Sequence, residues 1–193
     1  MAKILRDSSP QAIFESVKVL RNGGLVVFPT ETCYGFGADA ANKSALRKLF
    51  EAKGMPVSKK ISVMVSDKEM VHCFFGKDPR VDALIDAFLP GPLTIVTKGR
   101  SFRIPDYRFC RELAKKFGKP ITSTSSNLSG GSDHYTIRPI LRELNGVELI
   151  IDGGRLPKRK PSTVFDVDKM QVIRKGSISA LKIQGVLGQL EIL

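Results

Sequence analysis

Apolar positions in this chain follow two patterns, a three-to-four spacing and short continuous runs, which alternate along the sequence. The spaced pattern, ended each time near Gly or Pro, is typical of amphipathic helices. It predicts helices at residues 8–24, 42–54, 78–91, 108–120 and 137–146. The first of these begins with a serine cap and a proline and stops at Gly23 and Gly24, as capped helices do.

The continuous apolar runs between these helices are predicted as strands. They lie at residues 25–28, 60–66, 93–99, 147–152, 162–167 and 170–175, and the segment 121–126 is expected to begin as a strand and pass into a Ser/Asn/Gly loop. Several connections are too short for a crossover, so the sheet is expected to be mixed rather than parallel. The prediction is one α/β domain over residues 1–193, a single twisted mixed sheet with flanking helices. Residues 180–193 are expected to add a helix or a strand docked on the core.

Length and composition agree with a single globular domain, since the chain has 193 residues, 42% of them hydrophobic and 26% charged. No apolar run approaches the roughly 20 residues of a membrane span, and the N-terminus lacks the apolar stretch of a secretory signal. We therefore expect a cytoplasmic protein without membrane contact. Three widely spaced cysteines indicate reduced thiols, and two histidines without neighbouring ligands predict no protein metal site.

The net charge of +12 is the unusual bulk property and indicates a polyanionic partner such as a nucleotide, pyrophosphate or RNA. The basic residues are spread along the chain and are densest at Lys158 to Lys160. Trp is absent and only three Tyr occur, so a stacking platform for single-stranded nucleic acid is missing. The composition favours a nucleotide pocket over a long nucleic-acid groove.

Polar and glycine-rich segments interrupt the pattern at strand ends, where α/β proteins collect their ligands. Four of them stand out: "PTETCYG" (29–35), "AKGMPVSKK" (52–60), "STSSNLSGG" (123–131) and "KPSTVFD" (160–166). Hydroxyls, amides, lysines and backbone N–H groups in such turns suit a phosphate or a carboxylate. Together they predict an anion-binding cleft.

Several established chemistries are excluded by missing motifs. The chain has no G-x-x-x-x-G-K-[ST] loop and no G-x-S-x-G elbow, and its "GFGADA" lacks the third glycine of a dinucleotide fingerprint. The predicted chemistry therefore relies on positioning and charge stabilisation, with no nucleophilic side chain.

The same segments, taken in order, resemble the signature blocks of the YrdC/TsaC threonylcarbamoyl-AMP synthase family. The resemblance rests on "PTETCYGFGADA", "LFEAKGMP", "LPGPLTIV", "FRIPDY", "GKPITSTSSNLSGG" and "PSTVFDV...VIRKG", and it covers most of the chain. It implies a concave, positively charged cleft in which L-threonine, bicarbonate and ATP form threonylcarbamoyl-AMP and pyrophosphate, with Mg²⁺ assisting. A partner enzyme would then transfer the threonylcarbamoyl group to tRNA.

The resemblance also implies roles for nine residues. On the L-threonine side it places Thr32, Tyr34, Arg103, Ser123 and Ser162. On the ATP side it places Lys53, Ser125, Asn127 and Arg174, with Lys53 as the residue that stabilises charge. Lys59 is the tenth candidate, expected to contact phosphate although the family has no lysine there.

Structural alternatives remain open for several of these residues. Tyr34 could belong to the core, Arg103 could pair with Asp106, and Glu31 could cap a turn. Ser123 and Ser125 could satisfy only the backbone of their own loop.

The chain departs from the family pattern at three places. Met55 stands where the K-x-R motif has its arginine, and Lys59 or Lys60 is expected to replace that charge. Met64 stands where many relatives carry a histidine, and the segment before "FRIP" is short. The extra C-terminal domain of some members is absent, so a minimal single-domain form is expected. Three functions remain open: the synthase, a non-catalytic module of the same fold that binds tRNA or double-stranded RNA, and a relative that binds nucleotide for another carbamoyl-type chemistry.

Overall fold

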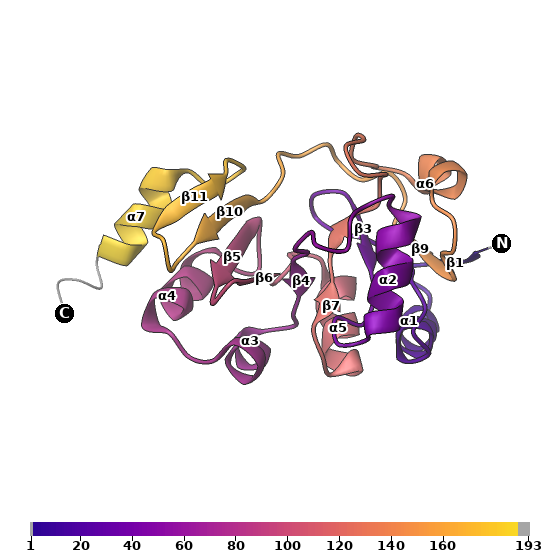
Figure 1. The fold of residues 1–193 in the computed structure, drawn as a ribbon, viewed down its shortest axis with the longest axis horizontal. Helices are drawn as coiled ribbons and strands as arrows, with labels where there is room; N and C mark the ends of the chain where they lie inside the picture. Colours follow the sequence, from indigo (N-terminus) through magenta and orange to yellow (C-terminus); the bar gives the residue numbers. More distant parts are fainter. Residues whose placement is uncertain (1, 189–193) are drawn as a thin grey trace.

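The strands form two mixed sheets that lie side by side (Figure 1). The computed structural model describes residues 2–188. The five-stranded sheet has the order β1 (Lys3–Arg6), β9 (Leu149–Asp152), β2 (Val26–Pro29), β3 (Tyr34–Gly37) and β8 (Thr124–Ser125). The six-stranded sheet has the order β11 (Gln171–Arg174), β10 (Thr163–Asp166), β5 (Leu93–Thr97), β6 (Arg100–Arg103), β4 (Val63–Met64) and β7 (Ile121–Thr122).

Parallel and antiparallel pairs occur in both sheets, which confirms the mixed α/β prediction. The prediction of one sheet was wrong, because the segment 121–126 does not form a single strand. It divides into β7 and β8, which belong to different sheets and are separated by Ser123 alone. The backbone N–H of Ser123 donates to the carbonyl of Ser62 at 2.8 Å. The polar segment 121–126 therefore lies where the two sheets meet.

Helices cover both faces of the five-stranded sheet. One face packs on α1 (Ala12–Arg21) and α5 (Arg108–Phe117), and the other on α2 (Lys43–Ala52) and α6 (Ile137–Glu143). Along β2, Val26 and Phe28 enter the first core and Val27 the second, which explains the continuous apolar run.

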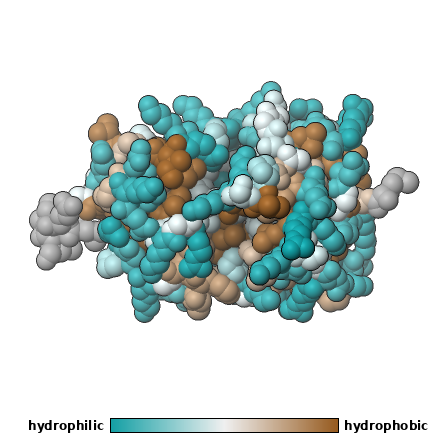
Figure 2. All heavy atoms as spheres, in the orientation of Figure 1, coloured by the Kyte–Doolittle hydropathy of each residue, from teal (hydrophilic) through white to brown (hydrophobic). Residues whose placement is uncertain are grey.

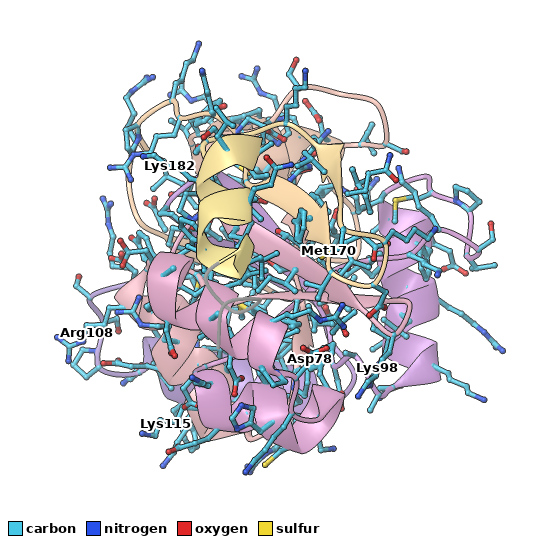
Figure 3. All side chains as sticks on the ribbon, turned by 90° about the vertical axis from the view of Figure 1, so that its left-hand side faces the viewer. Asp78, Lys98, Arg108, Lys115, Met170 and Lys182 are labelled. Carbon is cyan, nitrogen blue, oxygen red and sulfur yellow. The ribbon has the colours of Figure 1, made fainter. Side chains whose placement is uncertain are left out.

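The six-stranded sheet has its own core with α3 (Lys68–Phe75), α4 (Pro79–Phe88) and α7 (Ala180–Gly188). Figure 3 shows α7, which carries Lys182, beside α4. The C-terminal segment is thus a helix up to residue 188, and its last five positions lie outside the described residues. None of the helices within residues 2–188 is long and apolar enough to cross a membrane.

The predicted helices are all present, with small shifts at their ends. Asn42 caps α2 by accepting from the N–H groups of Ser44 and Ala45. The start of α1 differs, because Gln11 occupies the cap position and makes no side-chain cap bond. The strand expected at 60–66 is reduced to the two residues of β4.

Four elements were not predicted from the sequence: β1, α3, β3 and β6. The segment Tyr34–Gly37 reads as a loop because of its two glycines, yet it forms β3 against β2. A Cβ at Gly35 would lie 2.7 Å from the Phe28 ring, and one at Gly37 would lie 2.6 Å from it. The glycines therefore make room for Phe28 within the strand pair.

The short segment before "FRIP" is a tight hairpin. Lys98 and Gly99 form the two-residue turn between β5 and β6, with φ of 50° and 71°. Positive φ at both central positions is the geometry of a type I′ turn, which joins two strands directly. No longer loop is needed at this position.

Candidate functional site

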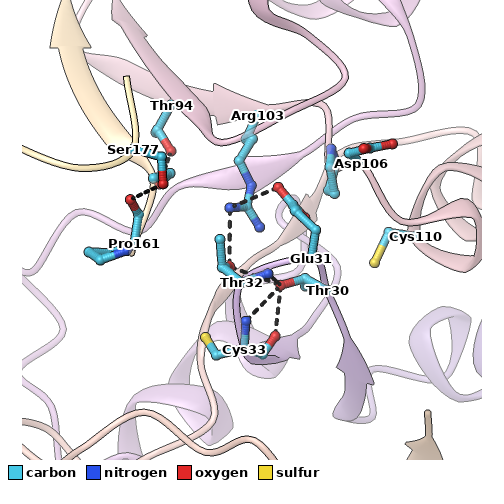
Figure 4. Close-up of polar contacts among 12 residues, drawn as sticks. Thr30, Glu31, Thr32, Cys33, Thr94, Arg103, Asp106, Cys110, Pro161 and Ser177 are labelled. Atoms are coloured by element: carbon cyan, nitrogen blue, oxygen red, sulfur yellow. Dashed lines mark hydrogen bonds and ion pairs between the residues drawn. The ribbon is translucent and has the colours of Figure 1, made fainter. Parts of the chain in front are cut away.

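The loop between β2 and β3 is shaped by a chain of hydroxyl groups. The Thr30 hydroxyl donates to the carbonyl of Cys33 at 2.7 Å and accepts from the N–H groups of Thr32 and Cys33. The two threonine hydroxyls lie 3.0 Å apart, and Nη1 of Arg103 donates to Oγ1 of Thr32 at 3.4 Å (Figure 4). Because the guanidinium can only donate, the Thr32 hydroxyl is directed toward Thr30. Thr32 is thereby fixed between the loop and Arg103.

Arg103 ends β6 and forms a buried ion pair with Glu31 (Figure 4). Its Nη1 lies 3.5 Å from Oε1 of Glu31. Asp106 pairs with Arg111 instead, at 3.3 Å, so the alternative in which Arg103 pairs with Asp106 is wrong. Glu31 is not a turn cap, since neither of its carboxylate oxygens has a hydrogen-bond partner among residues 2–188.

Lys53 lies at the C-terminal end of α2 and reaches toward β8. Its ammonium donates to the carbonyls of Ser125 and Asn127, the latter at 2.6 Å. Burial, reinforced by repulsion from Lys59, lowers the pKa of Lys53 to about 8. The group therefore retains its proton at neutral pH but holds it weakly.

The loop after β8 is held in place from both sides. The Ser125 hydroxyl donates to the side-chain oxygen of Asn127, and the Asn127 amide donates to the carbonyl of Leu128 at 2.9 Å. On the far side, Nδ1 of His134 lies 2.8 Å from the carbonyl of Ser126. The loop thus presents Ser125 and Asn127 in a fixed geometry.

The β10–β11 hairpin contributes the other end of the site. Arg174 donates through Nη2 to the hydroxyl of Ser162 at 2.9 Å and to its carbonyl at 3.0 Å. The Ser162 hydroxyl also lies 2.9 Å from that of Thr94 on β5. Burial, together with the nearby charge of Arg103, lowers the pKa of the Arg174 guanidinium. Two guanidinium groups therefore act on the same space.

These groups surround a cavity of about 260 Å³, called here the cleft. Nine of the ten candidate residues line it: Thr32, Lys53, Lys59, Arg103, Ser123, Ser125, Asn127, Ser162 and Arg174. The charged lining consists of five cations and one carboxylate, because Lys60 joins the four basic candidates and Asp133 is the acid. In the space-filling view, hydrophilic side chains cover most of the face, with hydrophobic residues exposed between them (Figure 2).

Tyr34 is the one candidate residue that does not line the cleft, although the sequence predicted it beside the threonine. The side chain is fully buried in the core of the five-stranded sheet and is not part of the cleft lining. Its hydroxyl donates to the carbonyl of Gly154 at 2.7 Å and accepts from the N–H of Gly153 at 3.0 Å. Tyr34 thus anchors the chain after β9, as the structural alternative had it.

The departures from the family pattern take different positions relative to the cleft. Met55 lines it and is 8% exposed, so a thioether occupies a wall position. Lys59 lies close enough to Lys53 to lower its pKa, whereas Nζ of Lys60 donates to the carbonyl of Gly99 at 3.2 Å. Met64 lies in the core beside α5 and is not part of the cleft lining. Lys59 is thus better placed than Lys60 to replace the charge of the missing arginine.

Sequence reasoning missed Thr94, Cys33 and Asp133 as lining residues. Thr94 reads as an ordinary strand residue, and only its pairing with β10 brings it beside Ser162. Burial raises the pKa of the Cys33 thiol to about 11, so it is a neutral wall group. No sequence signal distinguishes these residues from their neighbours.

The structure is thus that of an α/β protein with two mixed sheets and a cleft lined mainly by cations and hydroxyl groups. Comparison with known families gives a match over residues 18–176 to the Sua5/YciO/YrdC family, described as "Telomere recombination". This match covers most of the chain. The protein therefore belongs to the Sua5/YciO/YrdC family.

Two relatives match most of this chain but different shares of their own length. A Methanocaldococcus jannaschii protein is 35% identical over 181 residues, covering 86% of both chains. The threonylcarbamoyl-AMP synthase of Bacillus subtilis is 32% identical, and the match covers 97% of this chain but 60% of that protein.

Two solved structures have the same fold. Sua5 of Pyrococcus abyssi in complex with L-threonine superposes with a TM-score of 0.86 at 28% identity, covering 97% of this chain and 61% of that one. YciO of E. coli superposes with a TM-score of 0.79 at 26% identity, covering 93% and 97% of the two chains. This chain thus matches YciO over nearly its whole length.

Proposed function

We propose that the protein is an L-threonylcarbamoyladenylate synthase, which forms threonylcarbamoyl-AMP and pyrophosphate from L-threonine, bicarbonate and ATP. The observation that carries the proposal is the convergence of nine candidate residues, from Thr32 to Arg174, on one cationic cleft. Names of the relatives support it, since the Bacillus subtilis protein is a threonylcarbamoyl-AMP synthase and Pyrococcus abyssi Sua5 was crystallised with L-threonine.

The proposed reaction forms a C–N bond and an O–P bond, and it breaks a C–O bond of bicarbonate and the bond from the α-phosphorus to pyrophosphate. The threonine amine combines with bicarbonate to give a carbamate and water. A carbamate oxygen then attacks the α-phosphorus of ATP, and the bond to pyrophosphate breaks with its electron pair. Holding the carbamate in line with the α-phosphorus is the main task of the protein.

Different lining residues of the cleft suit the two substrates, and the hydrogen-bonded pair Arg174 and Ser162 would lie where the two substrates meet. In this proposal Arg103 and Thr32 bind the threonine carboxylate, because a guanidinium fork and a hydroxyl both match carboxylate oxygens. Lys53, Lys59 and Arg174 offset charge on the triphosphate. Ser125 and Asn127 flank the phosphates, and Ser123 and Ser162 supply hydroxyls beside the amino acid.

The donor set of the cleft also suits Mg²⁺ bound mainly through ATP. Asp133 is the one carboxylate among the described lining residues, and no cluster of three metal-ligating side chains occurs within residues 2–188. Mg²⁺ often uses one carboxylate together with phosphate oxygens and waters, so Asp133 would hold such an ion. When bound, the ion would neutralise phosphate charge.

The test is threonine-dependent pyrophosphate release in the presence of ATP and bicarbonate. We expect release from the wild-type protein and little from Lys53→Ala, because that variant lacks the buried ammonium that donates to the loop after β8. Release that does not depend on threonine, or that equals the Lys53→Ala background, would overturn the proposal. The product would pass to a partner enzyme that modifies tRNA.

A second function is favoured by the charge of the chain. The net charge is +12, and the exposed basic residues Lys158, Arg159 and Lys160 directly precede Pro161, which lines the cleft. A non-catalytic module would use this surface to bind tRNA or double-stranded RNA. Strongly salt-dependent RNA binding, without ATP binding or pyrophosphate release, would favour this function over the synthase.

A further inference from the structure

A second cavity of about 380 Å³ lies beside the cleft and has a different chemistry. It is formed by the end of α3, the β5–β6 turn, the loop before β4, the turn between α5 and β7, and Ala40 and Ala41 in the turn between β3 and α2. Its size falls in the range of cavities that hold small organic ligands. None of the ten candidate residues lines it.

The walls of this second cavity are largely apolar. Phe74 and Phe75 come from α3, and Ile61 and Val63 come from the loop and strand opposite. Phe74 is 39% exposed, which is high for a large aromatic side chain, whereas Phe75 is buried, with its ring centroid 4.7 Å from that of Phe102 and the two rings tilted by 49°. The cavity thus has one buried aromatic wall residue, Phe75, and one exposed aromatic wall residue, Phe74.

Three cations line the cavity, and no acidic residue is among its lining residues. The guanidinium of Arg100 lies 4.6 Å above the Phe75 ring and has no carboxylate partner among residues 2–188. Lys60 donates to a backbone carbonyl, and Lys119 lies 3.8 Å from Asp39, at the limit of an ion pair. Arg100 and Lys60 therefore have no carboxylate partner among residues 2–188, whereas Lys119 is partly compensated by Asp39.

The second cavity shares one wall with the cleft. Lys60, Ile61 and Val63 line both. The segment from Lys60 to Val63 therefore separates the two spaces, and a ligand on one side touches the wall of the other.

We propose that this second cavity is a binding site for a small aromatic anion, separate from the substrate cleft. The aromatic body would lie against Phe74 and Phe75, and the anionic group would pair with Arg100, with Lys119 at longer range. Charge complementarity selects an anion over a neutral or cationic ligand, because three cations and no carboxylates line the site.

Naphthoate and its neutral counterpart naphthamide are suitable probes, because they share one shape and differ in charge. Calorimetric titration should give saturable binding of naphthoate, about tenfold tighter than that of naphthamide. Arg100→Gln should weaken naphthoate about tenfold and leave naphthamide unchanged. Ala41→Trp, which fills the cavity from its edge, should abolish the binding of both probes.

The matched control is Arg138→Gln, which removes an exposed arginine on α6 outside the cavity and should leave the affinity unchanged. Saturating ATP and threonine should not displace the probe. Displacement, equal affinity for both probes, insensitivity to Arg100→Gln, or no saturable binding below about 1 mM would each overturn the proposal. Because binding is measured without turnover, the result is independent of the synthase activity.

Discussion

Nη1 of Arg103 lies 3.5 Å from Oε1 of Glu31, and the two side chains are only 9% and 5% exposed. Both partners come from segments that end at the cleft, the β2–β3 loop and strand β6. Glu31 supplies the counter-charge that a buried guanidinium requires. Because only Nη1 of Arg103 is engaged by neighbouring side chains within residues 2–188, the other N–H groups can serve a substrate carboxylate.

Glu31→Gln is expected to lower the free energy of unfolding by about 3 kcal/mol, because it leaves Arg103 buried without a counter-charge. Adding Arg103→Met removes the second charge, so the double variant should be more stable than the sum of the single effects by at least about 1 kcal/mol. Denaturant unfolding of the wild type, both single variants and the double variant measures this coupling. Additive losses would contradict it.

Arg103→Lys is expected to raise the KM for threonine at least about tenfold, since a point charge replaces the fork that holds a carboxylate. The matched control is Arg111→Lys, a nearby arginine that pairs with Asp106 outside the cleft. Steady-state kinetics with threonine as the varied substrate gives both values. Equal effects of the two substitutions would exclude a specific role for Arg103.

Lys53 makes the activity sensitive to pH. Its pKa of about 8 means that the ammonium is charged below that pH and neutral above it. We expect kcat/KM for ATP to fall as pH rises through about 8, because a neutral amine no longer attracts the triphosphate. In Lys53→Gln the value should be low and flat over the same range. A decline with the same midpoint in that variant would assign the titration to another group.

Met55 lacks the positive charge that an arginine at this position would supply to the phosphates. Lys59 lines the same cleft and is expected to supply that charge. Lys59→Gln should raise the KM for ATP about tenfold, as expected for the loss of a charge-assisted contact. Lys60→Gln is the matched control and should change it little, because Nζ of Lys60 donates to Gly99. Combining Lys59→Gln with Met55→Arg should restore ATP affinity; failure to restore it would assign the missing charge elsewhere.

Tyr34→Phe separates a structural role from a binding role. It removes hydrogen bonds to Gly153 and Gly154, so a loss of about 1 to 2 kcal/mol of stability is expected. The KM for threonine should not change, because Tyr34 does not line the cleft. An increase in that KM with unchanged thermal stability would show that Tyr34 contacts the substrate.

The sequence predicted most helices and the polar strand ends because those features are local. Asn42 caps its helix by contacts within three residues, and the apolar run through Val27 is visible directly. It could not predict that residues 121–126 divide between two sheets, since that depends on strand partners far along the chain. The same holds for Glu31, whose partner Arg103 is 72 positions away in the numbering.

Glycine-rich β3 shows a further limit. Gly35 and Gly37 indicate a turn when taken alone, but they accommodate the ring of Phe28 on the paired strand. Tyr34 is likewise buried in the core and does not lie in the pocket where the sequence predicted it. In each case a long-range contact decides the role, and no local pattern reports it.

Direct detection of the product tests the central claim. Incubation with ATP, L-threonine and isotopically labelled bicarbonate, followed at once by mass spectrometry, should show threonylcarbamoyl-AMP carrying the labelled carbon. The signal should require all three substrates and should be lost in Arg103→Gln and Lys53→Gln, which remove one cation from each end of the cleft. An unlabelled adenylate, or no adenylate from folded wild-type protein, would contradict the account.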